Sequence, residues 1–240
     1  MHGCGNDFMV VDGPLEIDAA RVRALCDRRT GVGADGILVV GAPRGRTWPL
    51  VIHNADGSIA DACGNGSRCV ARYLLDRHGG DELELDSASG ILRAWRDVEG
   101  IAIELAAPQL GGSLRVDGRE ARAVRVGNPN VIIFVDDPER EDLAALAAAS
   151  TAIAGPANVG AVRARGAGEI VLRVHERGVG ETLACGTGSC AAVSAAIARG
   201  DVTSDTVRVR LPGGTLVVRT VGDRYELAGP AEYVFAGETS

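Results

Sequence analysis

The stretch "ADACGNGSRCVA", residues 60–71, places a cysteine in a glycine-rich turn directly before a helical pattern. A second stretch, "LACGTGSCAAV" at residues 183–193, repeats this Cys-Gly-x-Gly-Ser turn 122 residues later (185 minus 63). One chain therefore carries the same unusual turn twice. The repeat is the main evidence for the fold, because the same offset of 122 residues also aligns other segments of the two halves of the chain.

The same offset aligns "GNDFMVVDGPLEIDAARVRAL" from Gly5 with "GNPNVIIFVDDPEREDLAALA" from Gly127. Each segment is Gly-Asn, a β-branched run, a turn with Asp and Pro, and an Ala/Leu-rich helix. The offset also places His53 on His175. Agreement of several segments on one offset indicates an internal duplication, and we expect two similar α+β domains.

Periodicity predicts the elements of each half. In the first half we expect helices at 18–29 and 65–77 and strands at 8–12, 37–40, 49–53, 82–86, 91–95 and 101–105. In the second half we expect helices at 139–149 and 188–199 and strands near 122–126, 131–135, 158–163, 169–175, 206–211 and 215–219. "LAAPQLGG" at 105–112 is predicted to break the pattern between the domains. A final strand at 231–235 could return to either domain.

Composition excludes several classes of function. The formal net charge is −7, and no basic face is evident for a nucleic-acid backbone. All 25 basic residues are arginine, which excludes a lysine Schiff base with pyridoxal phosphate and a phosphate-binding P-loop. The sequence has neither an apolar run of about 20 residues nor a signal peptide, so we expect a cytoplasmic protein without membrane association.

Two further features of the sequence, the cysteine spacing and a glycine-rich motif, do not indicate a metal site or a dinucleotide site. The six cysteines are expected to be thiols, and their spacings do not match the Cys-x-x-Cys pairs of common zinc sites, so no metal is expected. "GVGADG" at 31–36 matches the dinucleotide fingerprint G-x-G-x-x-G. That fingerprint requires a strand before it and a helix after it, and the predicted order here is the reverse.

Each cysteine turn suits acid–base chemistry. Cys63 and Cys185 stand at helix N-termini, where backbone amides and the helix dipole attract carboxylates. The same field can lower the pKa of a thiol from about 8.5 toward roughly 3.5–7.5. Two such thiols on opposite sides of one carbon could remove a proton from one face and deliver one to the other. This predicts cofactor-independent racemisation or epimerisation, with Gly64, Asn65, Gly186 and Thr187 binding the carboxylate of the reacting centre.

Polar residues at matched positions are candidates for binding the rest of a substrate. Asn6 and Asn128 open the two repeats, and Asn54 and the Glu176-Arg177 pair each stand nine residues before a cysteine. A carboxylate beside a fixed cation suits the ammonium and carboxylate groups of a zwitterion. Turn capping is the alternative role for each asparagine, and structural roles are expected for the two histidines.

Together these motifs resemble the diaminopimelate epimerase family. The resemblance rests on "HGCGNDF" (2–8), "NADGSIADACGNGSRC" (54–69), "GNP" (127–129), Asn158 and "ERGVGETLACGTGSCAA" (176–192), and it covers nearly the whole chain. In two places this sequence departs from the usual pattern of the family: Asn130 stands where relatives usually have histidine, and Gly36 stands where some have glutamine.

The resemblance implies an α+β fold of two pseudo-symmetric domains, each a curved, mostly antiparallel sheet around a central helix, with the active site in the interdomain cleft. The expected domains are residues 1–107 with 228–240, and residues 108–227. Cys63 and Cys185 would be the acid/base thiols, and no cofactor would be needed. The distal L-centre of an amino-acid substrate would be bound by Asn6, Asn54, Asn128, Asn158, Glu176 and Arg177. The implied reaction converts LL- to meso-diaminopimelate for lysine and peptidoglycan synthesis, and a homodimer is expected.

Three alternatives remain open at this point. The first is a racemase of another amino acid on the same fold, of the histidine or proline type, which Asn130 favours. The second is an isomerase of the phenazine-biosynthesis type, which shares the fold but lacks the paired cysteines. The third, from a different class, is a thiol redox or zinc-binding module.

Overall fold

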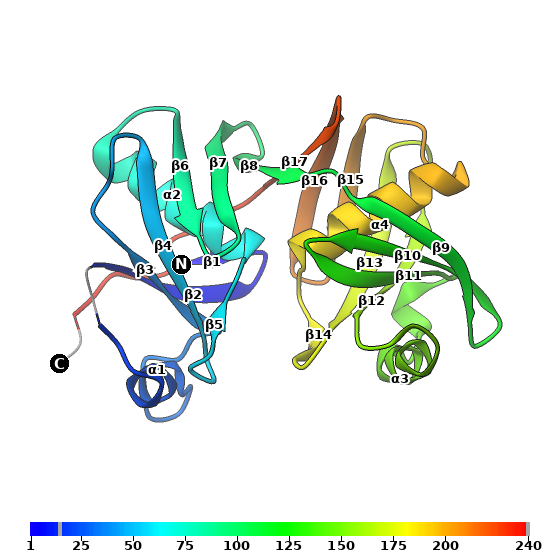
Figure 1. Ribbon diagram of the computed structural model, residues 1–240, viewed down its shortest axis with the longest axis horizontal. Coiled ribbons are helices and arrows are strands. Elements are labelled where there is room, and N and C mark those ends of the chain that lie inside the picture. The colour runs from blue at the N-terminus through cyan, green and yellow to red at the C-terminus, as the bar shows by residue number, and fades with distance from the viewer. Residues whose placement is uncertain (14–15, 239–240) are drawn as a thin grey trace. The chain divides into compact units, whose positions relative to one another are not determined.

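A computed structural model describes residues 1–13 and 16–238 of the chain. The chain divides into two compact units, residues 1–104 with 228–240, and residues 105–227 (Figure 1). The structure confirms the predicted α+β class, because each unit is a mixed sheet with few helices. The two units are described in turn.

The first unit carries two helices, α1 (Ala19–Cys26) and α2 (Gly64–His78). Its strands are β1 (His2–Gly3), β2 (Asn6–Asp12), β3 (Gly36–Val40), β4 (Thr47–Asn54), β5 (Ile59–Ala60), β6 (Glu82–Ser87), β7 (Gly90–Asp97) and β8 (Gly100–Ala106). Two of the strand pairs, β2 with β3 and β4 with β6, are parallel. The pairs β1–β2, β3–β4, β4–β5, β6–β7 and β7–β8 are antiparallel.

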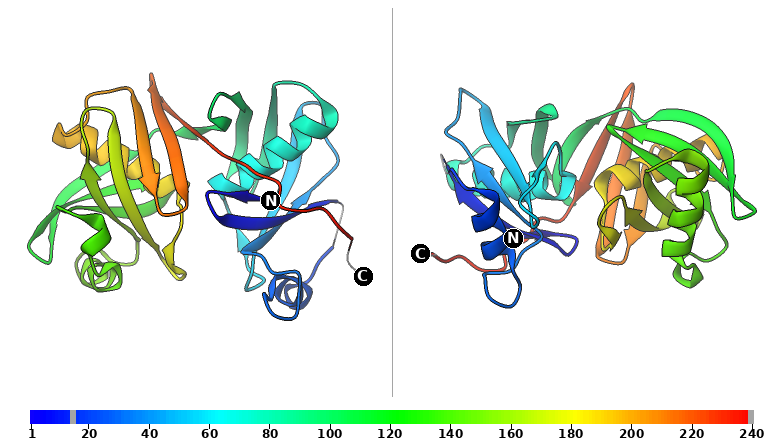
Figure 2. Two further views of the ribbon diagram at one scale, coloured as in Figure 1. Left: turned by 180° about the vertical axis from the view of Figure 1, so that it is seen from behind. Right: turned by 60° about the horizontal axis from the view of Figure 1, so that its bottom comes forward.

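Strand β3 lies between the two helices of this unit, and every one of its residues is buried. Ile37 and Val39 pack with Val22 and Cys26 of α1 in one apolar cluster. Successive side chains of a strand point to opposite faces, and Leu38 contacts the first turn of α2 on the other face. This is why "GILVV" is continuously apolar. Figure 2 shows α1 against one face of this sheet and α2 against the other.

The second unit repeats this arrangement with helices α3 (Leu143–Ala154) and α4 (Gly186–Arg199) and the 3-10 turn η1 (Pro138–Arg140). Its strands are β9 (Gln109–Val116), β10 (Arg119–Val126), β11 (Asn128–Phe134), β12 (Asn158–Ala164), β13 (Glu169–Glu176), β14 (Gly180–Thr182), β15 (Thr206–Leu211), β16 (Gly214–Val221) and β17 (Arg224–Gly229). The parallel pairs are β11–β12 and β13–β15.

Helix α4 is the centre of the second unit. It contacts β10, β11, β12, β13, β15 and β16, and all but four of its residues are buried. Its sequence "GTGSCAAVSAAIAR" consists mainly of small side chains, which lets strands approach the helix closely from several sides. Helix α3 packs instead on the outside, where Leu143 and Leu146 meet Val131 and Val159 (Figure 1).

The duplication is visible in the strand register. Phe8 pairs with Gly36 as Asn130 pairs with Asn158, and each residue of the second pair lies 122 positions after its counterpart. In the antiparallel neighbours, Ile37 pairs with His53 as Val159 pairs with His175. A shift of one residue would turn every side chain to the opposite face. The conserved register therefore places corresponding residues of the two units on corresponding faces.

Three predictions about local structure were wrong. The helix predicted at 18–29 ends at Cys26, because the Asp27 side chain accepts hydrogen bonds from the Arg29 and Thr30 amides and forms a turn. The helix predicted at 139–149 begins only at Leu143, where Asp142 caps it. The segment 105–112 does break the strand pattern, at residues 107 and 108 between β8 and β9, although strands extend into it from both sides. The strand predicted at 231–235 is a single bridge between His2 and Glu232.

Candidate active site

Cys63 is the N-cap of α2. Its backbone is extended, and its Sγ accepts a hydrogen bond from the amide of Gly66 at 3.3 Å. A side chain at position 66 would collide with this arrangement, because a Cβ there would lie 3.0 Å from Leu38 and 3.4 Å from the Cys63 Sγ. The glycine in "CGNG" thus allows the helix amide to reach the sulfur.

Cys185 caps α4 in the same way. Its Sγ accepts from the Gly188 amide at 3.5 Å, and a Cβ at position 188 would lie 3.2 Å from Val174 and 3.4 Å from the Cys185 Sγ. The shared "Cys-Gly-x-Gly" spacing therefore has one structural meaning in both units. It places a cysteine sulfur at the amide end of a helix.

The polar neighbours of Cys63 come from β2 and from the first turn of α2. Asn6 Oδ1 lies 3.9 Å from the Cys63 Sγ and accepts a hydrogen bond from Asn65 Nδ2 at 3.2 Å. Arg68, which is fully buried, donates from Nη2 to Asn65 Oδ1 at 2.9 Å. The structure thus brings together three of the predicted residues of the first unit. It adds Arg68, which sequence reasoning missed although it lies within the motif.

Cys185 has a different electrostatic environment. It is buried, and burial raises the pKa of the Cys185 thiol, with a further rise from the nearby Glu176 carboxylate. The Thr187 hydroxyl, 3.5 Å from the Cys185 Sγ, and the Gly188 amide lower the pKa by less. The expectation of a lowered thiol pKa at this helix N-terminus is therefore wrong for Cys185, because loss of hydration outweighs the helix amides.

The remaining candidates of the first unit are placed at turns. Asn54 ends β4, and its Nδ2 donates to Ser58 Oγ at 2.9 Å in an exposed turn. This is the turn-capping role considered above. Gly64 and Asn65 are the first two residues of α2, where backbone amides point out of the helix end.

The candidates of the second unit form two groups. Glu176 ends β13 and accepts from the Thr182 hydroxyl at 2.7 Å, beside Cys185, while Gly186 and Thr187 begin α4. In the other group Asn158 Oδ1 accepts from the Arg177 amide at 2.9 Å.

Asn130, the neighbour of Asn158 on β11, holds Asn128 in this second group. Its Nδ2 donates to the Asn128 backbone oxygen at 3.1 Å. Asn130 Oδ1 and Asn158 Nδ2 are both buried and have no hydrogen-bond partner.

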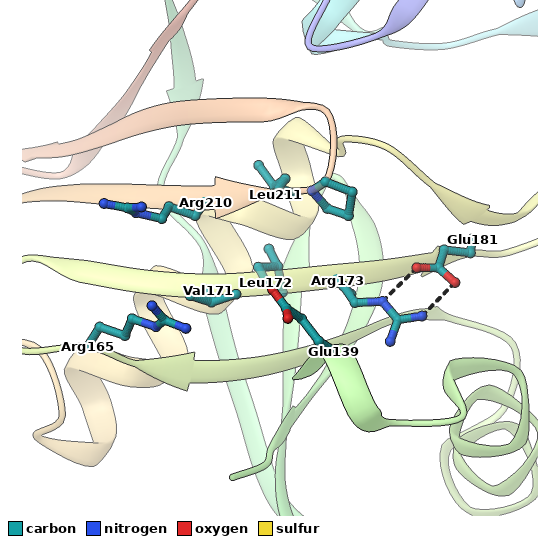
Figure 3. Close-up of a pocket in the computed structure, with 9 residues that line it drawn as sticks. Glu139, Arg165, Val171, Leu172, Arg173, Glu181, Arg210 and Leu211 are labelled. Carbon is teal, nitrogen blue, oxygen red and sulfur yellow. Dashed lines mark hydrogen bonds and ion pairs between the residues drawn. The ribbon is translucent and has the colours of Figure 1, made fainter. Parts of the chain in front are cut away.

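A separate pocket of about 600 Å³ lies in the second unit between β13, β15 and η1 (Figure 3). Its charged lining comes from Arg165, Arg173, Arg210, Glu139 and Glu181. None of the predicted site residues lines it. Arg173 and Glu181 are already joined in an ion pair there, so this pocket does not serve the chemistry of the cysteines.

All six cysteines are free thiols in the structure. Within residues 1–13 and 16–238, no group of three or more His, Cys, Asp or Glu side chains is arranged to hold a metal ion. Over the same residues, no helix is both long and apolar enough to cross a membrane.

The family model described as diaminopimelate epimerase matches residues 1–109 and 122–234. The chain belongs to the diaminopimelate epimerase family. A diaminopimelate epimerase of Xanthomonas euvesicatoria pv. vesicatoria is 41% identical over 269 residues, covering 99% of this chain and 94% of the relative. A diaminopimelate epimerase of Thioalkalivibrio sulfidiphilus is 37% identical over 268 residues, covering 99% and 96%.

Solved structures extend the similarity to the fold of other proteins. A protein described as a predicted epimerase of Pseudomonas aeruginosa gives a TM-score of 0.72 at 18% identity, over 94% of this chain and 90% of that one. A probable proline racemase of Agrobacterium radiobacter gives 0.69 at 14% identity, over 95% and 88%. The epimerase-family fold is therefore shared with proteins of other names, and the fold alone does not select the substrate.

Proposed function

We propose that this chain is an isomerase that converts LL-diaminopimelate to meso-diaminopimelate with two cysteines and no cofactor. The observation that carries the proposal is the placement of Cys63 and Cys185 as matched N-caps of α2 and α4. It is supported by identities of 36–41% to diaminopimelate epimerases over nearly the whole chain.

In the proposed reaction, one sulfur is a thiolate and the other a thiol. The thiolate takes the hydrogen of the substrate α-carbon as a proton and becomes a thiol. The other thiol gives its proton to the opposite face of the same carbon and becomes a thiolate. One C–H bond breaks and one forms, no electrons are lost, and the configuration of the carbon is inverted.

The environments of the two sulfurs support a division of roles. The pKa of Cys185 is raised by burial and by Glu176, so Cys185 is the thiol before the reaction. The residue Cys63 is less buried, and it supplies the thiolate that removes the α-proton of the LL substrate. After one turnover the protonation states are exchanged, which is the state required for the reverse reaction.

The negative charge that develops on the substrate must be stabilised by the protein. The amides at the starts of α2 and α4, at Gly64, Asn65, Gly186 and Thr187, would bind the carboxylate of the reacting centre. One hydrogen-bond donor in such a site typically contributes about 2.7–4 kcal/mol. Several converging amides are therefore needed to make the α-hydrogen acidic enough for a thiolate.

The distal L-centre would be bound by Asn6, Asn54, Asn128, Asn158, Glu176 and Arg177. Two buried amide atoms without a hydrogen bond, on the paired residues Asn130 and Asn158, support this part of the proposal. Asn158 Nδ2 is a donor for a carboxylate and Asn130 Oδ1 an acceptor for an ammonium group. A free amino acid offers both groups. We place the reaction in the cytoplasm, which agrees with six free thiols, and expect a homodimer.

The test is exchange of the substrate α-hydrogen in deuterated water, followed by mass spectrometry and chiral chromatography. We expect deuterium incorporation and interconversion of LL- and meso-diaminopimelate by the wild type. We expect both activities to be lost in Cys63→Ser and in Cys185→Ser. Full epimerisation by either single variant would refute the two-base mechanism.

A racemase of another amino acid is the second candidate, and the observation that favours it is Asn130 at the position where the family usually has histidine. The same exchange assay with proline and histidine decides between the two. Exchange with either of these amino acids but not with diaminopimelate would replace the substrate of the proposal and leave its chemistry unchanged.

A further inference from the structure

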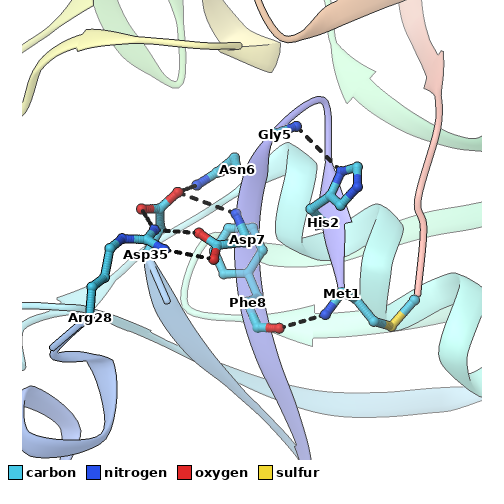
Figure 4. Close-up of polar contacts among 8 residues, drawn as sticks. All are labelled: Met1, His2, Gly5, Asn6, Asp7, Phe8, Arg28 and Asp35. Carbon is cyan, nitrogen blue, oxygen red and sulfur yellow. Dashed lines mark hydrogen bonds and ion pairs between the residues drawn. The ribbon is translucent and has the colours of Figure 1, made fainter. Parts of the chain in front are cut away.

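A row of hydrogen-bonded side chains crosses the first unit and passes Cys63. Arg68 donates to Asn65, Asn65 donates to Asn6 Oδ1, and Asn6 Nδ2 donates to Asp35 Oδ2 at 2.7 Å. Arg28 holds the far end, because its Nη2 lies 2.7 Å from Asp35 Oδ1 and 2.6 Å from Asp7 Oδ1. Figure 4 shows the Asn6, Asp7, Asp35 and Arg28 side chains converging.

The two ends of this row fix the direction of both amides between them. A guanidinium has only donors, and an ionised carboxylate has only acceptors. Arg68 therefore selects Asn65 Oδ1, and Asp35 selects Asn6 Nδ2. An asparagine side chain has its oxygen and nitrogen on opposite sides, so the Asn6 oxygen must turn toward Asn65 and Cys63.

The fixed orientation of the Asn6 amide determines which of its atoms faces the Cys63 sulfur. Its thiol donates to Asn6 Oδ1 at 3.9 Å, and its sulfur accepts from the Gly66 amide at 3.3 Å. An acceptor at the sulfur favours the thiol form, and a donor favours the thiolate form. These two neighbours of Cys63 suit different protonation states of its sulfur. Reversal of the Asn6 amide would place a second donor at the sulfur and favour the thiolate alone.

The second unit has no equivalent of this row of hydrogen-bonded side chains. The repeat offset of 122 places Ala157 at the position of Asp35 and Ser150 at the position of Arg28. Asn128, the counterpart of Asn6, accepts instead from Asn130. The row therefore acts on one cysteine of the pair.

We propose that Asp35, anchored by Arg28, is a positioning residue that orients the Asn6 amide and so holds an acceptor against the Cys63 thiol. This inference rests on the proposed function only in treating Cys63 as an acid/base group. Its direct consequence is that loss of the Asp35 carboxylate leaves Asn65 as the remaining constraint on the Asn6 amide, so that Asn6 reverses in part of the molecules and the pKa of Cys63 falls. The other titratable or charged groups around this part of the unit are not substituted in the test: Cys4, Asp7, Arg28, Arg68, Cys69 and the N-terminal amine. Asp7 and Arg28 contact Asp35 directly, and any effect that they transmit is present with and without Asn6.

The experiment measures the rate of Cys63 alkylation by iodoacetamide as a function of pH, without substrate. Trypsin releases residues 47–68 as one peptide in which Cys63 is the only cysteine, so mass spectrometry reports this thiol alone. In Asp35→Asn, Asn6 can reverse because the new amide can offer it a donor. We expect the midpoint of the alkylation curve to fall by about one pH unit, the size of one hydrogen bond exchanged at an ion.

Two controls separate orientation from charge. Asp12→Asn removes an equal charge at the other end of β2, where Asp12 pairs with Arg77, and should leave the midpoint within about 0.2 units. In an Asn6→Ala background, Asp35→Asn should shift the midpoint by less than half as much, because the amide that it acts through is absent. Asp35→Glu, which keeps an acceptor, should restore most of the wild-type midpoint.

An equal shift with and without Asn6, or no shift in either background, would overturn the inference. If Asp35→Asn does not fold, Asp35→Ser replaces it, and the same two outcomes decide. Because no substrate is used, this titration is independent of the proposed function. A wild type that fails to epimerise any amino acid but shows the expected shift would refute the function and leave the positioning role standing.

Discussion

Asn130 and Asn158 are direct partners in the parallel ladder of β11 and β12, and each keeps one buried amide atom without a hydrogen bond. An unpaired buried polar atom costs about 1–3 kcal/mol. We propose that these two atoms, an acceptor and a donor on paired residues, are satisfied when a ligand supplies the opposite groups. The proposal also accounts for the hydrogen bonds that join these two residues to Arg177 and Asn128, which are candidates for the same site.

We therefore predict that Asn130→Leu separates stability from activity. Leucine has a similar size and removes the unpaired oxygen, at the loss of the hydrogen bond to Asn128. The free energy of unfolding, measured by urea denaturation, should stay within about 1 kcal/mol of the wild type. The value of kcat/KM for the substrate should fall at least about tenfold, because the ligand loses a buried partner.

Ser150→Ala is the matched control for this prediction. Ser150 is fully buried in α3 of the same unit, its Oγ has no partner, and it is not a site residue. Alanine should raise the free energy of unfolding by about 1 kcal/mol and leave kcat/KM unchanged. A loss of more than about 2 kcal/mol in Asn130→Leu, with unchanged kinetics, would show that Asn130 is a structural residue.

Local patterns predicted much of this structure. The cysteine turns, the helices behind them and most of the longer strands follow from periodicity and from one repeat offset, which the register of β2–β3 and β11–β12 reproduces. The short strands β1, β5 and β14 and the strand β17 were not predicted. Strand β9 was missed because Pro108 and two glycines predicted a break. Pro108 lies between β8 and β9, where no ladder hydrogen bond is required of it.

The environments of the site residues were harder to predict than their positions. Asp35 contacts Asn6, 29 positions away, only because β3 pairs in parallel with β2. The local sequence "GVGADG" contains no pattern that predicts this contact. The raised pKa of Cys185 likewise depends on burial within the whole second unit. The helix N-terminus alone predicts the opposite direction.

A second prediction concerns the influence of Glu176 on Cys185. Glu176→Gln removes the carboxylate that raises the pKa of Cys185, so this pKa should fall and the Cys185 thiolate should form at lower pH. The pH dependence of Cys185 alkylation, followed by fragmentation of its tryptic peptide, measures the shift. In the epimerase assay, the limb of the pH profile due to loss of the Cys185 proton should move to lower pH.

Glu181→Gln provides the control for charge alone. Glu181 lies on the neighbouring strand β14 and forms an ion pair with Arg173 at 2.7 Å. Its substitution changes the net charge by the same amount without touching Cys185. Equal shifts of the Cys185 pKa in the two variants would contradict a specific effect of Glu176.

The last prediction follows from Cys69, which lies fully buried in α2. Burial raises its pKa to about 12. In the unfolded chain a thiol ionises near pH 8.5–9. Between about pH 9 and 12 the unfolded chain therefore loses a proton that the folded protein retains, and stability falls as the pH rises. The free energy of unfolding should drop by about 1.4 kcal/mol per pH unit for this thiol alone, and below about pH 8 Cys69 should add no pH dependence.

Urea denaturation of wild type and Cys69→Ala at pH 7.5, 9 and 10 tests this. The variant should be less stable at pH 7.5 because of the small cavity, and the difference should shrink by about 1 kcal/mol between pH 9 and 10. Parallel curves for the two proteins would mean that Cys69 ionises equally in the folded and unfolded states.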